Sequence, residues 1–254
     1  MLNLLDWIRG DEYYQIRIVV MVALTIMVKL LFFFAFFQVI KKEVFIVVLT
    51  SRDYLILHLI HRFRFCLGRH IKDLCGFSGS RIADRRLKIL CDNGYLQKQK
   101  VLYGTPTIYT LTHKAKVLIG VSRKKENIRV ERLLHNIAVL DCVVYLVQKK
   151  QLTLEEIKTE REMFSADGFG AIKHRPDFIH VEDGTTNAYE VELTLKSIDR
   201  FHANIKENYL NYHNQIWIVP QREKKIHQLL SDWQDSYSNL EIIFLEELIT
   251  NKQN

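Results

Sequence analysis

The chain has 254 residues, a length that accommodates one large domain or two small ones. Its hydrophobic content of 48% and its three prolines exclude a largely disordered chain, and its four cysteines lack the CxxC spacing of zinc fingers, which indicates buried thiols in a reducing compartment. The net charge of +7 is unevenly distributed, so its pattern along the chain says more than its total.

The first predicted element is a strongly apolar segment over residues 18–40. At helical rise this segment is long enough to cross a bilayer of about 30 Å. A signal peptide would be shorter in its apolar part and would end in a small-residue cleavage site, which is absent. Lys41 and Lys42 follow directly and favour a cytoplasmic body that begins after the segment. We therefore predict a cytoplasmic protein anchored to the inner membrane by this helix.

Two other interpretations of the apolar segment stay open. It could be a buried helix, or it could result from a start codon assigned too early, because Met21 and Met27 can also initiate translation. Lys29 near the middle would cost about 2.5–3.5 kcal/mol on insertion, which the surrounding apolar side chains can offset.

Three helices are predicted next, over about 51–63, 69–75 and 80–92. Thr50 or Ser51 can cap the first helix, and Ser80 can cap the third. Asn93-Gly94 is a typical stop signal for the third. That third helix carries basic residues on one side and apolar residues on the other.

Two segments of alternating residues follow, 95–101 and 107–111, joined around Gly104. Helix, short helix, turn, basic helix and hairpin is the order of a winged helix-turn-helix. In that fold the third helix enters the major groove and the hairpin, or wing, meets phosphates. The residues predicted to bind DNA are Arg69, Arg81, Arg85, Arg86, Lys88, Lys98 and Lys100. A basic helix can also be a solvated face, and winged helices also dock proteins.

The final half of the chain predicts a mixed α+β domain. Its elements are a helix over 128–149, a strand over 153–163, two strands over 177–181 and 187–193, a helix over 197–212, a strand over 215–219, a helix over 223–233 and a strand over 240–245. His135, near the start of the long helix, is interpreted as a structural hydrogen-bonding residue. The core order is therefore α-β-β-β-α-β, and the chain as a whole is assigned to the α+β class.

Charge also separates these two parts of the chain. Residues 52–125 carry 16 Lys or Arg against 4 acidic residues, whereas residues 126–254 carry 15 against 21. A basic segment followed by an acidic one indicates a polyanion-binding module joined to a domain with a cation site. We predict an N-terminal segment over 1–43, a winged-helix domain over 44–125 and an α+β domain over 126–254.

A turn signal at Asp183-Gly184 makes the geometry of the acidic residues predictable. A two-residue hairpin loop there would place Asp177 opposite Glu190. Because side chains alternate along strands, Glu192 would share their face. Three carboxylates so close repel one another, and a bound cation or a raised pKa is the expected remedy. We predict Mg²⁺ or Mn²⁺ at this patch.

Three further residues are candidates for the site. Lys196 lies beyond the third strand and could stabilise charge that develops on a phosphate, as could Arg175. Glu160 could add a metal ligand from the first strand. It stays open whether Glu192 is a third ligand with no lysine required, or whether these acids merely occupy the wet face of a β-ribbon.

Pro176-Asp177 followed by Glu190-Val191-Glu192 resembles the PD-(D/E)XK nuclease fold. In that fold, Pro-Asp on one strand and Glu-x-Lys on the next build the metal site. Glu192 stands where the pattern has lysine, and by this resemblance Lys196 would supply the ammonium group from the following helix. The resemblance implies a nuclease domain over residues 126–254.

These motifs, with the segments 69–71, 84–87 and 93–96, resemble the replication-relaxation family, most closely its MobC-type mobilisation relaxases, over about residues 48–248. The resemblance implies nicking of double-stranded DNA at a transfer origin of a plasmid or mobile element, with Asp177, Glu190 and Glu192 as the metal-binding or catalytic acids. Accessory mobilisation proteins, a coupling protein and the membrane are the expected partners.

Two rival functions stay open. The protein could be a membrane-associated winged-helix regulator or replication accessory whose nuclease-like half is inactive. It could also be a restriction-like defence nuclease, which would cut both strands.

Overall fold

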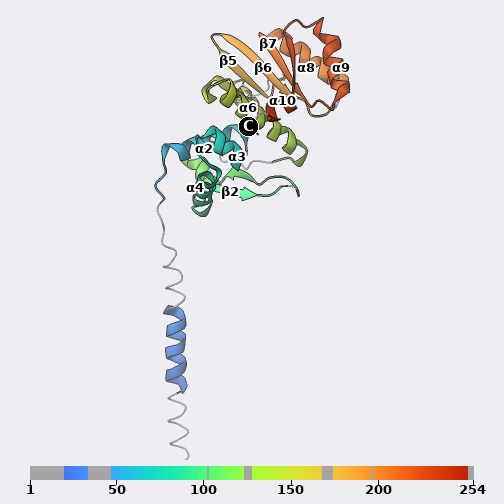
Figure 1. Cartoon of the computed structure of the whole chain (residues 1–254). Helices are drawn as coiled ribbons and strands as arrows, with labels where there is room; N and C mark the ends of the chain where they lie inside the picture. Colours follow the sequence, from blue (N-terminus) through green and yellow to red (C-terminus); the bar gives the residue numbers. More distant parts are fainter. Residues whose placement is uncertain are drawn as a thin grey trace, which may run out of the picture. The chain divides into compact units, whose positions relative to one another are not determined.

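The computed structural model describes residues 20–33, 47–101, 103–122, 128–167, 174–195 and 197–250 (Figure 1). The chain divides into two units, residues 1–47 and residues 48–254. In the first unit, residues 20–33 form a helix whose apolar side chains are exposed. No helix in the described ranges is long and apolar enough to cross a bilayer. The rest of the predicted span over 18–40 lies outside the described residues.

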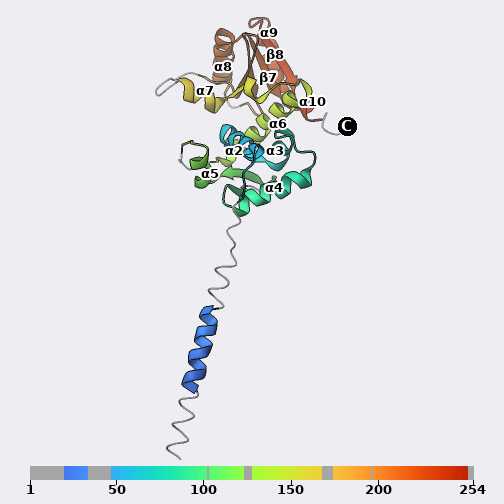
Figure 2. The same cartoon turned by 90° about the vertical axis from the view of Figure 1, so that its left-hand side faces the viewer.

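The second unit begins with the predicted winged-helix order (Figure 2). Its elements are α2 (Ser51–Phe63), β1 (Cys66–Leu67), α3 (Gly68–Leu74), α4 (Ser80–Asp92), β2 (Leu96–Gln99), β3 (Ile108–Leu111) and α5 (His113–Leu118). The strands form an antiparallel sheet in the order β1-β3-β2. The three predicted helices and the hairpin are confirmed, whereas β1 and α5 were not predicted. Gly79 caps α4 in place of the predicted Ser80.

The rest of the unit is built around a five-stranded sheet in the order β4-β5-β6-β7-β8. Its strands are β4 (Ile157–Thr159), β5 (Phe178–Glu182), β6 (Thr185–Val191), β7 (Asn214–Val219) and β8 (Leu240–Phe244). Strands β4 to β6 pair antiparallel, and β6 to β8 pair parallel. The helical elements are η1 (Val130–Arg132), α6 (Leu133–Lys149), η2 (Leu154–Glu156), α7 (Glu160–Asp167), α8 (Ile198–Asn211), α9 (Lys224–Gln234) and α10 (Leu245–Thr250). Two sheets with flanking helices confirm the α+β class.

Helices cover both faces of the larger sheet, as successive residues of β7 show, because they are buried on opposite sides of it. Ile216 and Ile218 belong to a core shared with α6 and α10. Trp217 and Val219 belong to a second core with α8 and α9. A strand buried on both faces is expected to be continuously apolar, and β7 is apolar from Ile216 to Val219.

The predicted first strand over 153–163 is wrong at both ends, where the helical elements η2 and α7 lie. Only Ile157–Thr159 is extended, and the helix α7 starts at Glu160. The amide and hydroxyl of Thr159 donate to the Glu162 carboxylate at 2.8 and 2.9 Å, and the amide of Glu162 donates to the Thr159 hydroxyl at 3.3 Å. This reciprocal capping box stops the strand and starts the helix.

The predicted two-residue turn is confirmed. Asp183 and Gly184 both have positive φ, 47° and 78°, and Glu182 pairs with Thr185. Farther along the same ladder, Phe178 pairs with Tyr189, so the residues just beyond them, Asp177 and Glu190, lie at the same end of the hairpin.

The winged helix and the larger sheet share one hydrophobic core, with α6 between them (Figures 1 and 2). The Arg69 guanidinium donates to Asp141 of α6 at 2.8 Å, and His70, fully buried, lies 3.2 Å from the same carboxylate. Residues 48–254 therefore fold as one unit. Cys66, Cys75 and Cys142 are buried thiols, as the sequence predicts, and Cys91 is partly exposed.

Candidate functional site

A cavity of about 230 Å³ lies where β5 begins and β6 ends. Four carboxylates line it: Asp177, Glu190, Glu192 and Glu160. Three arginines, Arg132, Arg175 and Arg200, line it as well. The cavity therefore combines a surplus of acidic groups, which suits a cation, with guanidinium groups, which suit a phosphate.

Asp177 is held in place from three directions. One carboxylate oxygen accepts from the amide of Val191 at 2.8 Å, and the other lies 2.9 Å from the His135 ring. The Asp177 carbonyl accepts from the amide of Glu160 at 3.0 Å, which ties α7 to the start of β5. The carboxylate is thus fixed in orientation before any ligand binds.

Glu190 is buried, with only 8% of its surface exposed. The His174 ring is in direct hydrogen-bond contact with its carboxylate, and the Asn208 amide of α8 donates to it at 3.0 Å. The amide of His174 donates in turn to Glu207 at 3.0 Å. Glu190 therefore sits in a network that comes from three parts of the chain.

Burial is the largest influence on the ionisation of Glu190 and raises its pKa to about 6, with Asp177 adding to the rise and His174 and Asn208 opposing it. Burial opposes protonation of His174, but its contacts with Glu190 and the negative charges of Asp177 and Glu207 prevail and raise its pKa. For acids this close together, the sequence predicts either a bound cation or a raised carboxyl pKa. The raised pKa of Glu190 is the second of these alternatives.

The arginines of the cavity differ in how firmly they are held. Arg175 donates to Asp167 at 2.7 Å and lies over the Phe164 ring at 4.9 Å. Arg132 and Arg200 are exposed at the cavity wall. The exposed pair is therefore better placed than Arg175 to move toward a bound phosphate.

The structure brings the predicted acids together, with Glu160 on a helix and not on a strand. Glu192 follows β6, and its amide donates to the carbonyl of Ile218 at 3.0 Å. Lys196 lies outside the described residues. Within the described part of the chain, no three His, Cys, Asp or Glu side chains are arranged to hold a metal ion.

Sequence reasoning assigned no site role to His135 and Asn208. Both lie on helices far along the chain from the carboxylates they contact. His174 differs from these two residues. It lies close to Pro176-Asp177 in the sequence, and this closeness could have indicated a role at the site. A polar residue at a buried helix position was the available signal for Asn208.

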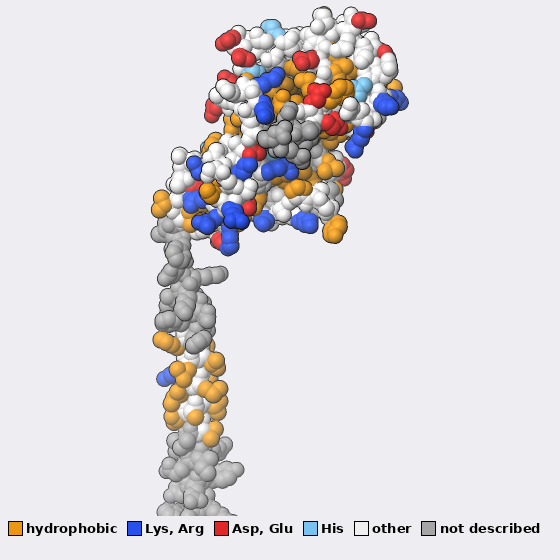
Figure 3. Space-filling view, viewed as in Figure 1, with side chains coloured by type: hydrophobic (Ala, Val, Ile, Leu, Met, Phe, Trp, Pro, Cys, Tyr) orange, Lys and Arg blue, Asp and Glu red, His pale blue; other side chains and the backbone are white. Residues whose placement is uncertain are grey.

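The predicted DNA-binding residues fall into two groups, and the first is exposed. Arg81, Arg85 and Lys88 project from α4, and Lys98 and Lys100 lie in or next to β2. Figure 3 shows Lys and Arg side chains gathered over this end of the unit. Lys88 is also 2.7 Å from Asp92 one turn along α4, a contact between two exposed groups that is weak in water.

Arg86 and Arg69 form the second group, whose guanidinium groups bind carboxylates of the protein itself, although the Arg69 side chain is partly exposed. Arg86 donates to buried Asp53 at 2.7 Å and to the Val48 carbonyl at 3.1 Å. Burial opposes ionisation of Asp53, but bonds from Arg86 and Thr50 prevail and lower its pKa. Arg69 binds Asp141, so this pair of arginines joins helices to one another.

Comparison with known protein families gives a match over the middle of the chain. The model of a protein family described as replication-relaxation matches residues 57–216, more than half of the chain, from within α2 to within β7. No curated protein and no solved structure matches the sequence.

Proposed function

The chain belongs to the replication-relaxation family, which suggests a role in replication or mobilisation, and we propose that it nicks double-stranded DNA at a plasmid or mobile-element transfer origin. One observation carries the proposal. Asp177 and Glu190, from neighbouring strands, face a single arginine-walled cavity in the same folded unit as a winged helix with an exposed basic face.

We propose that Asp177, Glu190 and Glu192 hold Mg²⁺ or Mn²⁺, with Glu160 as a further ligand. The chemistry of the donors suits a hard cation, since four carboxylates line the cavity and carboxylate oxygens are its preferred ligands. Their side chains would have to converge on the ion, because no three of them in the described residues are arranged to hold a metal. When bound, the cation would polarise the phosphate and lower the pKa of a bound water.

The chain's own residues would position the other participants. His135 and the Val191 amide hold Asp177 in one orientation, and His174 and Asn208 do the same for Glu190. Arg132 and Arg200, with Lys196 of the sequence motif, would stabilise charge on the phosphate in the transition state.

The winged helix would bind DNA and locate the site to be nicked. In this proposal α4 enters the major groove with Arg81, Arg85 and Lys88, while Lys98 and Lys100 meet phosphates. Arg86 would support α4 through buried Asp53 of α2, and Arg69 would hold α3 to α6 through Asp141. We also propose three partners besides DNA: accessory mobilisation proteins, a coupling protein and the membrane.

The test is incubation of supercoiled plasmid that carries the intergenic DNA next to the gene with purified protein, with Mg²⁺ or Mn²⁺ and with EDTA. We expect open-circular product only with the cation, and none from Asp177→Ala or Glu190→Ala. A matched control is Glu182→Ala, an exposed acid of the same hairpin that lies away from the cavity.

Other results of this assay would indicate a different function. A shift of DNA on a gel without relaxation would indicate a binding regulator with an inactive second half. Linear product would indicate a nuclease that cuts both strands. Nicking by both carboxylate variants at the wild-type rate would remove the cavity from consideration.

A further inference from the structure

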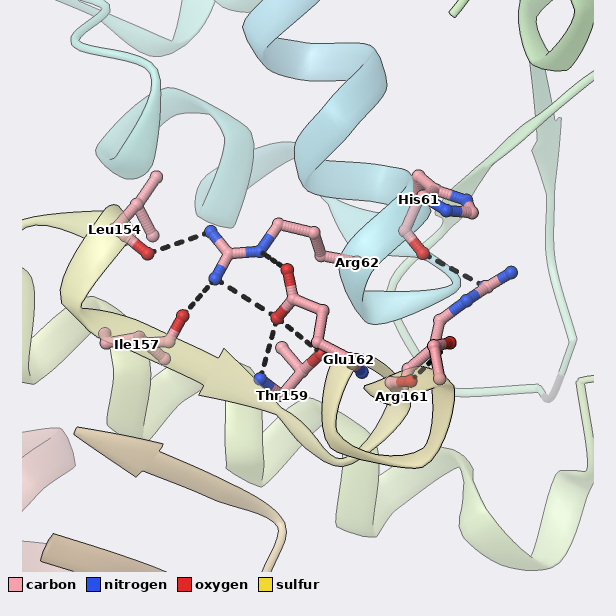
Figure 4. A network of polar contacts seen from close by, with 8 residues as sticks. His61, Arg62, Leu154, Ile157, Thr159, Arg161 and Glu162 are labelled. Carbon is pink, nitrogen blue, oxygen red and sulfur yellow. Dashed lines mark hydrogen bonds and ion pairs between the residues drawn. The ribbon is translucent and has the colours of Figure 1, made fainter. Parts of the chain in front are cut away.

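The last turn of α2 is bound to the elements that carry the acidic cavity (Figure 4). The Arg62 guanidinium donates to Glu162 at 2.7 Å and to the carbonyl of Leu154 at 3.0 Å, and it also contacts the carbonyl of Ile157. Arg161 of α7 donates back to the carbonyl of His61 at 3.0 Å. These bonds fix the end of α2 against β4 and α7.

Arg64, the residue just after α2, has an unusual backbone. Its φ is 69° and its ψ is −34°, in the positive-φ region that glycine adopts freely and other residues adopt only with strain. Strain of this kind persists where the surrounding structure imposes it, often at functional sites. The bonds at His61 and Arg62, just before the turn, and the pairing of Cys66 with Tyr109, just after it, supply that constraint here.

The strained turn directs the Arg64 side chain toward the cavity. Its guanidinium lies 3.8 Å from the Glu160 carboxylate and is 38% exposed. It lines a small hollow together with Asn136, Glu160 and Asp177, and Glu160 and Asp177 also line the larger cavity. The hollow and the cavity thus adjoin at these two acids.

We infer that Arg64 is a phosphate-binding residue that the winged-helix module supplies to the acidic cavity, where it would grip the DNA backbone next to the phosphate to be cut. The inference rests on the proposed function. A guanidinium matches phosphate through paired hydrogen bonds. Its contact with Glu160 is long and half-exposed, so it is weak and easily exchanged. Arg62 and Arg161 are held by backbone carbonyls and are poorly placed for this role.

The test is Arg64→Gly, which removes the guanidinium and relieves the backbone. We expect an unchanged or higher Tm, because glycine favours this φ. We also expect nicking to slow by about tenfold or more, because the variant loses a charge-assisted hydrogen bond to the phosphate. The plot of log Kobs for DNA against log salt should become shallower by about 0.9, the change for one phosphate contact. Arg64→Lys should restore the slope and part of the rate.

Gln151→Gly is the matched control. Gln151 has a φ of 57° and is exposed in the loop after α6. It lines neither the small hollow nor the larger cavity. Its replacement should relieve strain in the same way and change neither nicking nor the salt slope.

The salt slope decides the outcome. An unchanged slope for Arg64→Gly would overturn the inference and leave the arginine as a partner of Glu160 alone. Because the slope is measured by binding, it tests the inference even if the wild-type protein does not nick, an outcome that would count against the proposed function only.

Discussion

The two central carboxylates differ in their surroundings. Asp177 accepts from a backbone amide, whereas Glu190 is buried and depends on the side chains of His174 and Asn208. Burial and the charge of Asp177 hold the pKa of Glu190 near 6, so this residue changes charge close to neutral pH. Glu190 is therefore the member of the pair through which pH would act on the protein.

The raised pKa of Glu190 should make the stability of the protein depend on pH. Its pKa of about 6 exceeds its ordinary 4.5, so its protonated form contributes stability that is complete below about pH 4.5 and lost as pH rises through about 6. The raised pKa of His174 acts in the same direction at somewhat higher pH. We expect the unfolding free energy of the wild type, relative to Glu190→Gln, to fall as pH rises across this range.

Urea denaturation in EDTA at a series of pH values would measure this difference. Glu182→Gln, an exposed residue of the same hairpin, serves as the control and should follow the wild type at every pH. Parallel curves for the wild type and Glu190→Gln would show that burial does not perturb the carboxyl group.

The sequence predicted the pairing of the acids but not their polar partners. Asp183-Gly184 is a local signal, and it sets the relation of Asp177 to Glu190 through strand alternation alone. Asn208 and His135 reach the same point from helices whose packing no local pattern specifies. For the same reason, the basic pattern of α4 could not show that Arg86 would turn inward to a buried aspartate.

Among the elements, α7 shows how a short polar signal overrides a longer pattern. Alternation around residues 153–163 predicts a strand, yet Thr159 and Glu162 cap a helix that starts within it. Thr-x-x-Glu is readable in the sequence, so this part of the fold was predictable. The break matters because it brings Glu160 toward the cavity and lets Glu162 bind Arg62.

The hairpin of β5 and β6 should be sensitive at its turn. Gly184 has a φ of 78°, so Gly184→Ala should cost about 1 kcal/mol or more of stability through backbone strain. A disturbed turn would also weaken the register that aligns Asp177 with Glu190, and nicking should fall more than stability alone explains. Thermal unfolding and the nicking assay on the same samples would measure both effects.

Gly68→Ala is the control for this change. Gly68 lacks a positive φ, and an added Cβ would meet its nearest neighbours at 3.7 Å, an ordinary contact distance. It should leave stability and nicking near the wild type. Equal behaviour of the two variants would mean that the turn does not control the site.

At the scale of the whole unit, the basic and acidic halves are joined by α6. Hydrophobic patterning predicts that α6 is buried, but not that it packs against both the winged helix and the sheet. Asp141, a buried acid in the middle of α6, receives Arg69 and His70 from α3. The proposed DNA-binding helix α4 is thereby connected to the cavity through packed helices.

Asp141→Ala tests this connection. It removes the shared partner of buried His70 and half-exposed Arg69, and a buried polar group left without its partner costs about 1–3 kcal/mol. Asp141→Asn, which keeps a hydrogen-bonding side chain, should cost less. Tryptophan fluorescence during urea unfolding reports on the sheet half through Trp217 of β7 and Trp233 of α9, with Trp7 replaced by Phe in all samples. Circular dichroism reports on the helices of both halves. If the halves form one cooperative unit, the two signals coincide in the wild type and shift together in Asp141→Ala. Separate transitions in the wild type would mean that the winged helix and the sheet are only tethered, and a DNA-bound α4 would then not fix the cavity on the duplex.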